Sequence, residues 1–444
     1  MKKYSSYKST GNERICNIPS HWNLILFKRI IDKIKDGTHG TYARVLEGHP
    51  LLSAKNVFNN GLKISQNESL ISEESYLEIT KNGFPKKGDL LITCVGTIGR
   101  TMVYDKEEPL AFQRSVSFLR LNNLKSIPSF YKYYVESSIY QTELLNLAKT
   151  SAQSGVYMGD ILNSQTVLPP IEEQVQIANY LDQKTTQIDE LIAKKEQLIQ
   201  LLEEERIAII NQAVTKGLNP DAPMKDSGID WLGEIPEHWK NNRIDWIAKL
   251  IRGNTGLKKD ELLNEGEYVA LQYGKTYKIN EVNDTFNYYV NSEYFKENQI
   301  VNFGDTIFIS TSETIEDLGH SCYYNRNDLG LIGGEQILLK PDSRFIFNKY
   351  LYYYSKKMGS ILQRYAKGLK VFRFKIDDLK QVSIPLPPIQ EQVKIVEHLD
   401  SEMMRIRSLK KLYKKEIELL KEYKTTLISE VVTGKIDVRE EVLN

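Results

Sequence analysis

The sequence predicts a mixed α/β protein that is a tandem duplication, in which each copy holds one globular domain followed by one long helix. Two observations support this prediction. The stretch 168–217 aligns without a gap with 386–435, at an offset of 218 residues. The globular parts match more weakly, as where GDLLI at 88–92 lies on GDTIF at 304–308. A period of about 217 residues is too long for a solenoid repeat, so the copies are two modules of one chain.

Length and composition are those of an ordinary globular protein with two or three domains. The chain has 444 residues, of which 41% are hydrophobic and 26% are charged. The net charge is +1, so no global basic field indicates a nucleic-acid partner. Cys16, Cys94 and Cys322 lie far apart and suggest neither a disulfide framework nor a zinc site. Because the chain starts without the apolar region of a signal peptide and has no run of about 18 apolar residues, we expect a cytoplasmic protein.

Each globular domain should mix short strands with helices. Helices are predicted to begin at Pro128 and Asn348. The tyrosines that follow these two positions are interpreted as core residues, with stacking on DNA bases as the less favoured alternative. Two apolar runs open directly after Gly-Asp, as expected where a turn leads into a strand. The predicted strand pairs are 89–95 with 115–121 and 306–310 with 335–340.

The repeated stretches predict two long helices. Each starts at a Pro-Pro pair, which suits a first helical turn, and the glutamates after it suit the positive helix end. Apolar residues recur every seven positions in otherwise charged sequence, which indicates a helix paired with another helix. Each helix would be about 65–70 Å long at 1.5 Å per residue. A charged surface helix on one domain is the alternative. The stripes are Leu181, Ile188, Leu202 and Ile209, with Leu191 and Leu198 on the adjacent seam position, and Leu399, Ile406, Tyr413, Leu420 and Leu427, with Leu409.

The domain boundaries follow from this repeat. The first globular domain is predicted over 1–167 and its long helix over 168–217. A linker is predicted over 218–227, because this stretch has two prolines and directly follows a glycine, a composition typical of loops. The second globular domain is predicted over 228–384, its long helix over 385–435, and a C-terminal tail over 436–444.

Catalytic motifs are missing from the sequence. There is no Asn/Asp-Pro-Pro-Tyr/Phe methyltransferase motif, no H-E-x-x-H, and no phosphate-binding loop, since Val269 stands where its first glycine should precede Gly274-Lys275-Thr276. The Glu422-Tyr423-Lys424 spacing lies on the heptad helix and is interpreted as chance. His-Trp recurs at 21–22 and 238–239 and is interpreted as structural packing. We therefore expect no catalytic residue, no metal site and no cofactor on this chain.

A basic segment with aromatic residues is the strongest binding signal. Residues 367–375 interleave four cations with two aromatic side chains, which suits contact with phosphates. A strand or helix end with a solvated face remains the alternative. The equivalent stretch 149–157 is less charged but rich in groups that can bond phosphates. The candidates are Lys367, Lys370, Arg373 and Lys375 in the second half, and Lys149, Ser154 and Tyr157 in the first.

Loops that differ between the halves give the second binding signal. The stretches 38–42 and 51–56 have no clear echo in the second half, and 310–319 matches 93–99 by position only. Matching frames with dissimilar inserts would present two different reading surfaces. For the loop at 36–44, a binding loop and a structural turn are equally supported. The candidates for DNA contact are Thr38, His39, Tyr42, Arg44, Lys55, Asn56, Arg100, Ser310, Thr311 and Ser312.

Taken together, these motifs resemble those of the specificity (S) subunit of type I restriction–modification systems. The resemblance covers nearly the whole chain. It rests on the duplicated LPP-I-x-EQ helices that end in AVTKG and VVTGK, on IPSHW and SGIDWLGEIPEHW, and on DGTHGTY, GDLLITCVGTIGR and STSETIEDLG. The first copy has Asn12 to Cys16 where the second has IDWLG, for which we expect a local packing difference only.

The resemblance implies a non-catalytic reader of double-stranded DNA. Two target-recognition domains would each read half of a split sequence. The long helices would pack as an antiparallel coiled coil, act as a spacer, and dock two methyltransferase subunits. Restriction subunits would join the complex, and S-adenosylmethionine, ATP and magnesium would belong to these partners. A self-contained restriction–methylation enzyme and a coiled-coil scaffold that reads no bases are the alternatives.

Overall fold

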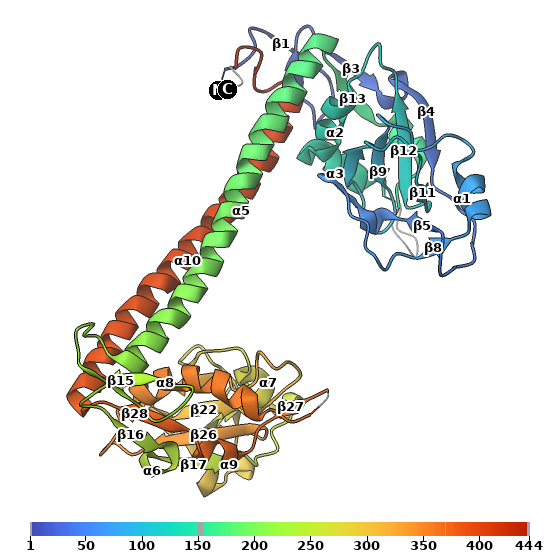
Figure 1. Ribbon diagram of the computed structural model, residues 1–444. Coiled ribbons are helices and arrows are strands. Elements are labelled where there is room, and N and C mark those ends of the chain that lie inside the picture. The colour runs from blue at the N-terminus through green and yellow to red at the C-terminus, as the bar shows by residue number, and fades with distance from the viewer. Residues whose placement is uncertain (1, 149–154, 369, 442–444) are drawn as a thin grey trace. The chain divides into compact units, whose positions relative to one another are not determined.

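The computed structural model describes residues 2–148, 155–368 and 370–441 (Figure 1). The chain divides into two compact units. The first comprises 1–196 with 413–444, and the second comprises 197–412. Each unit therefore holds one globular domain together with a part of both long helices, and each is described below by itself.

The first unit contains β1 to β13 with α1 to α4. Their bounds are β1 Tyr7–Ser9, β2 Asn17–Pro19, β3 Asn23–Leu26, β4 Ile31–Asp36, β5 His49–Leu52, β6 Val57–Phe58, β7 Gly61–Leu62, β8 Leu70–Ile71, α1 Glu73–Thr80, β9 Leu90–Thr93, β10 Thr101–Val103, β11 Ala111–Phe112, β12 Val116–Leu121, α2 Pro128–Glu136, α3 Ser138–Leu147, α4 Met158–Asn163 and β13 Gln165–Leu168.

The second unit contains β14 to β28 with α6 to α9. Their bounds are β14 Met224–Asp226, β15 Glu234–Pro236, β16 Lys240–Arg243, α6 Ile244–Ile247, β17 Ala248–Arg252, β18 Tyr268–Leu271, α7 Tyr273–Thr276, β19 Glu281–Val282, β20 Tyr289–Val290, β21 Ile300–Val301, β22 Thr306–Ile309, β23 Thr311–Ser312, β24 Ser321–Tyr324, β25 Gly330–Ile332, β26 Gln336–Pro341, α8 Asn348–Leu362, β27 Phe372–Arg373, α9 Ile376–Lys380 and β28 Ser383–Leu386. The long helices are α5 Ile171–Lys216 and α10 Ile389–Val432.

The two globular domains share one sheet plan. The first has the strand order β10-β9-β12-β4, and the second has β17-β26-β22-β24-β19, so that β19 is an added edge strand. Beside each lies a smaller sheet with one parallel pair, β11 with β5 and β18 with β25. The predicted strand pairs are confirmed, since β12 pairs with β9 and β26 with β22. The predicted helix starts are also confirmed, at α2 and α8.

The Gly-Asp turn before each central strand has a clear structural cause. Gly88 has φ 88°, a left-handed conformation that costs glycine least. Asp89 then accepts a hydrogen bond from the amide of Lys86 at 2.6 Å and pairs with Arg120 of the neighbouring strand at 2.9 Å. In the second domain the carboxylate of Asp305 pairs in the same way with Lys340, at 2.8 Å. The repeated dipeptide thus fixes both the turn and the strand beside it.

The long helices pack against each other in opposite directions within each unit. In the first unit, Asp189 pairs with Lys424 at 2.6 Å and Lys195 with Glu416 at 2.5 Å. In the second unit, ion pairs join Glu203 to Lys410 at 2.7 Å and Glu205 to Arg405 at 2.6 Å. Numbers rise along α5 while they fall along α10, which is the antiparallel coiled coil that the resemblance implied. Figure 1 shows α5 in green beside α10 in red.

The seam of this coiled coil differs from the prediction at one register position. Leu181, Ile188 and Leu202 are buried as predicted. Leu191 and Leu198, however, are 42% and 41% exposed, so their assignment to the adjacent seam position is wrong. The buried residues of the second seam position lie four residues after a stripe residue, and not three. Thr185 follows Leu181 in this way, and Ile192 follows Ile188. Positions i+3 and i+4 are both near neighbours on a helix, and the hydrophobic residue types alone did not separate them.

The Gln of the repeated LPP-I-x-EQ motif joins each long helix to its domain. The side chain of Gln392 is fully buried at the start of α10. Its amide oxygen accepts a hydrogen bond from the backbone of Phe347 at 2.7 Å. Its amide nitrogen donates to the carbonyls of Phe345 at 3.1 Å and Pro387 at 2.9 Å. Gln174 is equally buried and makes three bonds of the same kind, to Ile127, Lys125 and Pro169.

Replacing Gln392 by Leu should therefore destabilise the protein. The change keeps the size of the side chain but leaves one buried amide and two buried carbonyls unpaired. Such groups cost about 1–3 kcal/mol each, and partial solvation on relaxation should bring the total to about 2–4 kcal/mol. A urea titration measures the free energy of unfolding. The exposed Gln381→Leu is the matched control, and a loss in Gln392→Leu no larger than in that control would contradict the role given to this residue.

The His-Trp pairs pack against the start of the long helices and are confirmed as structural. The ring of Trp239 is fully buried. Its indole nitrogen donates to Glu391 at 3.1 Å, and His238 contacts the same carboxylate at 2.8 Å. His21 contacts Glu173 in the same way at 2.9 Å. The Glu of the LPP-I-x-EQ motif therefore contacts the His in each half and also the Trp in the second half, while the Gln beside it holds the domain.

The tyrosines after Pro128 and Asn348 are core residues, as predicted. Tyr133 and Tyr353 are buried, with 2% and 4% of their surface exposed. Their hydroxyls donate to the aspartates of the repeated Leu-Asp dipeptide, Asp182 at 2.6 Å and Asp400 at 2.5 Å. Burial raises the pKa of both phenols well above the usual range. These hydroxyls are therefore permanent donors that tie α2 and α8 to the long helices.

Candidate nucleic-acid interface

Two predicted binding segments of the second domain meet in the fold. The short strand β23 pairs in antiparallel fashion with β27, so that Thr311 lies opposite Arg373 and Ser312 opposite Phe372. The amide of Phe374 adds a hydrogen bond to the carbonyl of Ser310, at 3.2 Å. Segments about 60 residues apart in sequence thus form one structural element, which the sequence did not predict.

The basic segment forms a tight turn at the end of this element. The backbones of Lys367 and Arg373 exchange two hydrogen bonds, at 2.9 and 3.0 Å. Gly368 has φ 128°, and a Cβ there would lie 2.0 Å from the carbonyl oxygen of Val371, so only glycine fits. All four predicted cations of the segment are exposed. We call Lys367, Lys370, Arg373 and Lys375 the cationic turn.

The three hydroxyl residues on the facing strand are used inside the domain. Ser310 and Thr311 are each 8% exposed, and Ser312 is fully buried. The hydroxyl of Thr311 donates to the carboxylate of Glu335. The hydroxyl of Ser312 bonds that of Tyr277 at 2.8 Å. Two of these hydroxyls thus fix the strand that pairs with the cationic turn, and contact of the three residues with DNA stays a prediction.

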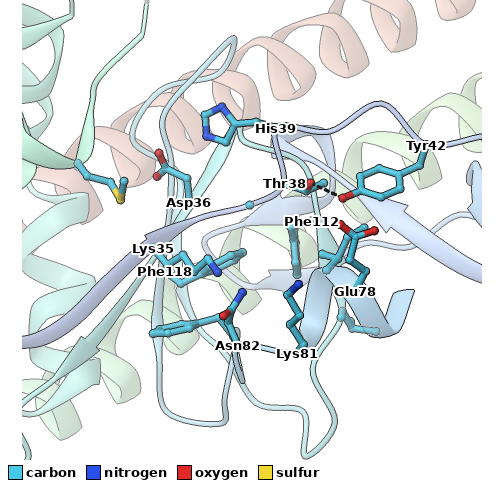
Figure 2. A pocket seen from close by; sticks show the side chains of 15 residues that line it. Lys35, Asp36, Thr38, His39, Tyr42, Glu78, Lys81, Asn82, Phe112 and Phe118 are labelled. Carbon is cyan, nitrogen blue, oxygen red and sulfur yellow. Dashed lines mark hydrogen bonds between the residues drawn. The ribbon is translucent and has the colours of Figure 1, made fainter. Parts of the chain in front are cut away.

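The first domain presents the loop DGTHGTY at the end of β4. Thr38 bonds the hydroxyl of Tyr42 at 3.0 Å and accepts a hydrogen bond from the amide of Gly40 at 3.1 Å. His39 and Arg44 are exposed. Loop residues line a pocket of about 320 Å³ together with residues of α1 and an aromatic floor (Figure 2). The pocket residues include Lys35, Asp36, Thr38, His39, Tyr42, Glu78, Lys81, Asn82, Phe112 and Phe118.

The electrostatics of this pocket are mixed. Burial raises the pKa of the Asp36 carboxyl, which accepts a hydrogen bond from the hydroxyl of Ser117. Figure 2 shows the side chain of His39 above that of Asp36, and Lys35 and Lys81 nearby. Cationic and anionic side chains both line the pocket around an apolar floor, and this mixture suits contacts with base edges better than contacts with phosphates alone.

A counterpart of this loop exists in the second domain, although the sequence comparison found none. Residues 252–256, RGNTG, begin at the last residue of β17, as DGTHG begins at the last residue of β4. A Cβ on Gly253 would lie 1.8 Å from the carbonyl oxygen of Gly333, and a Cβ on Gly37 would lie 2.2 Å from that of Gln113. Thr255 and Thr38 then form equivalent parallel bridges to these two residues. The prediction that 38–42 has no counterpart in the second half is therefore wrong. The counterpart was missed because the second loop has one extra residue between its glycine and its threonine, which shifts the sequence alignment.

Three further candidates of the first domain lie together in another part of the fold. Lys55 is exposed and pairs with Glu68 at 2.7 Å. Asn56 is 2% exposed, and its amide bonds the carbonyl of Lys63 at 3.0 Å and also Glu68. Arg100 lies with its guanidinium carbon 4.5 Å from the centre of the Phe58 ring. Arg100 lines a cleft of about 620 Å³ between the β6–β7 hairpin, α2 and the long helices. These residues are not brought to the DGTHGTY loop.

The remaining candidates lie on the segment before α4. Lys149 and Ser154 are outside the described residues. Tyr157 is 55% exposed and precedes α4. The segment reaches the sheet through a bridge between Val95 and Gly155, the equivalent of the pairing of β23 with β27. Within the described ranges, no group of three His, Cys, Asp or Glu side chains could hold a metal ion. No helix in those ranges is long and apolar enough to span a membrane.

Comparison with known proteins gives one consistent result. A family model described as the type I restriction modification DNA specificity domain matches residues 28–201 and again 236–419. The chain is 27% identical over 452 residues to the protein named as the type I restriction enzyme MjaX specificity subunit of Methanocaldococcus jannaschii, and the match covers 98% of each chain. The MjaVIII specificity subunit of the same organism is 22% identical, with 95% of this chain and 94% of that protein covered.

Solved structures share the fold. The crystal structure of the HsdS subunit from Thermoanaerobacter tengcongensis matches 94% of this chain and 98% of its own, with a TM-score of 0.56 and 16% identity. A chain from a study of complex assembly and conformational transition of the type I R-M system matches with a TM-score of 0.71, also at 16% identity. This match covers 94% of the present chain and 99% of the solved chain.

Proposed function

The chain belongs to the family of type I restriction modification DNA specificity domains, and from this premise we propose how its two halves read DNA. It is the DNA specificity subunit of a type I restriction–modification system, with two target-recognition domains. It is not itself catalytic, and the cofactors of such a system reside on the methyltransferase and restriction subunits. A self-contained restriction–methylation enzyme is thereby set aside.

Each domain would read one half of a split double-stranded DNA sequence. The domains would extend over 1–167 and 228–384, with 218–227 as the linker and 168–217 and 385–435 as spacer helices. The observation that carries this proposal is the shared frame with different loops, DGTHG in one half and RGNTG with the cationic turn in the other. Such a protein would act in the cytoplasm, where the DNA that it reads is located. Mapping of methylated adenines in a host genome, with and without this chain, tests the proposal.

The cationic turn should supply phosphate contacts. Replacing Lys367 and Lys370 by Ala should weaken binding to all DNA sequences alike, because phosphates carry no sequence information. The slope of log affinity against log salt should fall by about two units, one for each lost contact. Salt titrations of DNA binding by the complex measure this slope.

The matched control replaces Lys240 and Lys249, two exposed lysines of β16 and β17, by Ala. The control removes the same charge from the same domain and should leave the slope near its original value. Equal slopes in both double variants would assign the cationic turn to folding or to a protein contact.

Exposed leucines on the long helices should dock the two methyltransferase subunits. Leu191 and Leu198 are about two-fifths exposed on α5, as Leu412 and Leu419 are about half exposed on α10. Replacing Leu191 and Leu198 by Ser should lower the yield of methyltransferase subunits that co-purify with the chain, with little change in its melting temperature. Ser at the exposed Leu46 and Leu124 of the first domain is the control. Equal yields in both would remove these positions from the docking surface.

A further inference from the structure

One residue of the second domain combines an unusual backbone with an unusual charge. Glu335 has φ 64° and is the only residue other than glycine with a positive φ in the described part of the chain. For any residue other than glycine, this left-handed conformation costs free energy. Gly and Asn adopt it more readily than Glu does. Glu335 lies directly before β26, in the turn that follows β25. A turn requirement alone would therefore favour another residue at this position.

The strained turn is fixed at the point where the candidate binding segments meet. The carbonyl of Glu335 accepts a hydrogen bond from the amide of Ser310 at 3.1 Å. The amide of Gly334 donates to the carbonyl of Thr255, in the RGNTG loop, at 3.0 Å. Residue 335 thus stands between the loop after β17 and the start of β23, the strand that pairs with the cationic turn. Strain of this kind is found where a side chain must be presented at a functional site.

The carboxylate of Glu335 is oriented and remains accessible. It accepts a hydrogen bond from the hydroxyl of Thr311. The Nε of Arg373 lies 3.9 Å away, beyond hydrogen-bonding distance, and the Glu335 side chain is 46% exposed. A hydroxyl and a nearby guanidinium therefore hold one carboxylate in place while leaving oxygen lone pairs free.

The carboxylate of Glu335 needs a hydrogen-bond donor as its partner on the DNA. It stands beside the cationic turn, where phosphate groups would be repelled by a carboxylate and would bind better without it. The major-groove edges of base pairs offer amino donors at cytosine and adenine. A carboxylate only accepts hydrogen bonds, so the N7 acceptor beside the adenine amino group opposes it, whereas cytosine presents its amino group without such a neighbour.

We propose that Glu335 is a specificity-determining residue that accepts a hydrogen bond from a cytosine amino group in the half-site read by the second domain. Arg373, beside it, would then reach the O6 and N7 acceptors of the guanine in the same pair, while the lysines of the cationic turn keep the phosphate contacts. This inference rests on the proposed function, since it requires that the second domain contacts base edges. Glu335 would thus select one base pair, C·G, at one position of one half-site.

The test uses the complete complex with its methyltransferase subunits. The half-site of the second domain is the one that stays unchanged when the first domain is exchanged. Duplexes carrying each of the four base pairs at every position of that half-site are then methylated by the wild type and by Glu335→Gln. The wild type should require a C·G pair at one position. In Glu335→Gln this preference should fall about tenfold or more, with adenine gaining most, because an amide both donates and accepts.

Two further variants separate reading from folding. Glu335→Gly should relieve the strained turn and raise the melting temperature, while it loses the same base preference. Asp284→Asn removes an equal charge from an exposed position after β19, at the other edge of the sheet from β17, and should keep the motif unchanged. A half-site without a C·G pair, or the same base preference in wild type and Glu335→Gln, would overturn the role of Glu335. A wild-type complex that methylates no split sequence would instead refute the proposed function.

Discussion

Exchanging residues 13–165 for the equivalent domain of a relative should change one half of the methylated sequence completely and leave the other half intact. Each domain has its own buried cores, and among the described residues those of the second domain contain none from this segment. The loops that differ between the halves lie within single domains, so each half-site should depend on one domain only. Adenine methylation mapped across a host genome gives both half-sites in one measurement.

The matched control exchanges the same segment for that of a relative with an identical first half-site. The mapped motif should then stay the same, which excludes an effect of the chimeric joints themselves. A motif altered in both halves by the first exchange would show that the domains do not read independently.

Lengthening both long helices should widen the gap between the half-sites without changing either half-site. Four residues added after Leu202 would lengthen α5 by about 6 Å. The facing insertion in α10 belongs after Lys410, which pairs with Glu203. Four residues are slightly more than one turn, so the buried stripe stays nearly in phase. Since stacked base pairs are about 3.4 Å apart, the gap should grow by one or two base pairs.

A graded series makes this test decisive. Seven residues added to each helix should preserve the heptad and widen the gap by about three base pairs. An insertion in α5 alone is the control, because it shifts one half of the seam against the other and should lower the melting temperature. If both double insertions fold and methylate with the original gap, the helices serve for docking and do not set the spacing.

Much of the fold could be predicted because the chain repeats itself. The repeat located the central strand pairs and the long helices, and heptad spacing found Leu181, Ile188 and Leu202 in the seam. The exposed Leu191 and Leu198 were misplaced because residue type does not distinguish neighbours at i+3 from neighbours at i+4. The choice depends on the crossing geometry of the two helices, which is a property of the pair.

The candidate interface was harder to predict because its parts meet only in the folded chain. The cationic turn stood out from its charges, but its pairing with β23 depends on a strand register between distant segments. The hydroxyls of Thr311 and Ser312 could not be recognised as inward-facing without that register. The RGNTG loop was missed because a single inserted residue removed its alignment, and the importance of Glu335 became visible only from its backbone conformation.

The buried glutamines of the LPP-I-x-EQ motif also bear on how such a protein can evolve. Every partner of Gln174 and Gln392 is a main-chain atom, an amide or a carbonyl. Main-chain groups are the same whichever side chains surround them, so the joint between helix and domain demands little of the domain's own sequence beyond the tyrosine and the His-Trp pair described above. New domains can therefore be recombined onto the same helices, and specificity can diversify while the attachment is inherited unchanged.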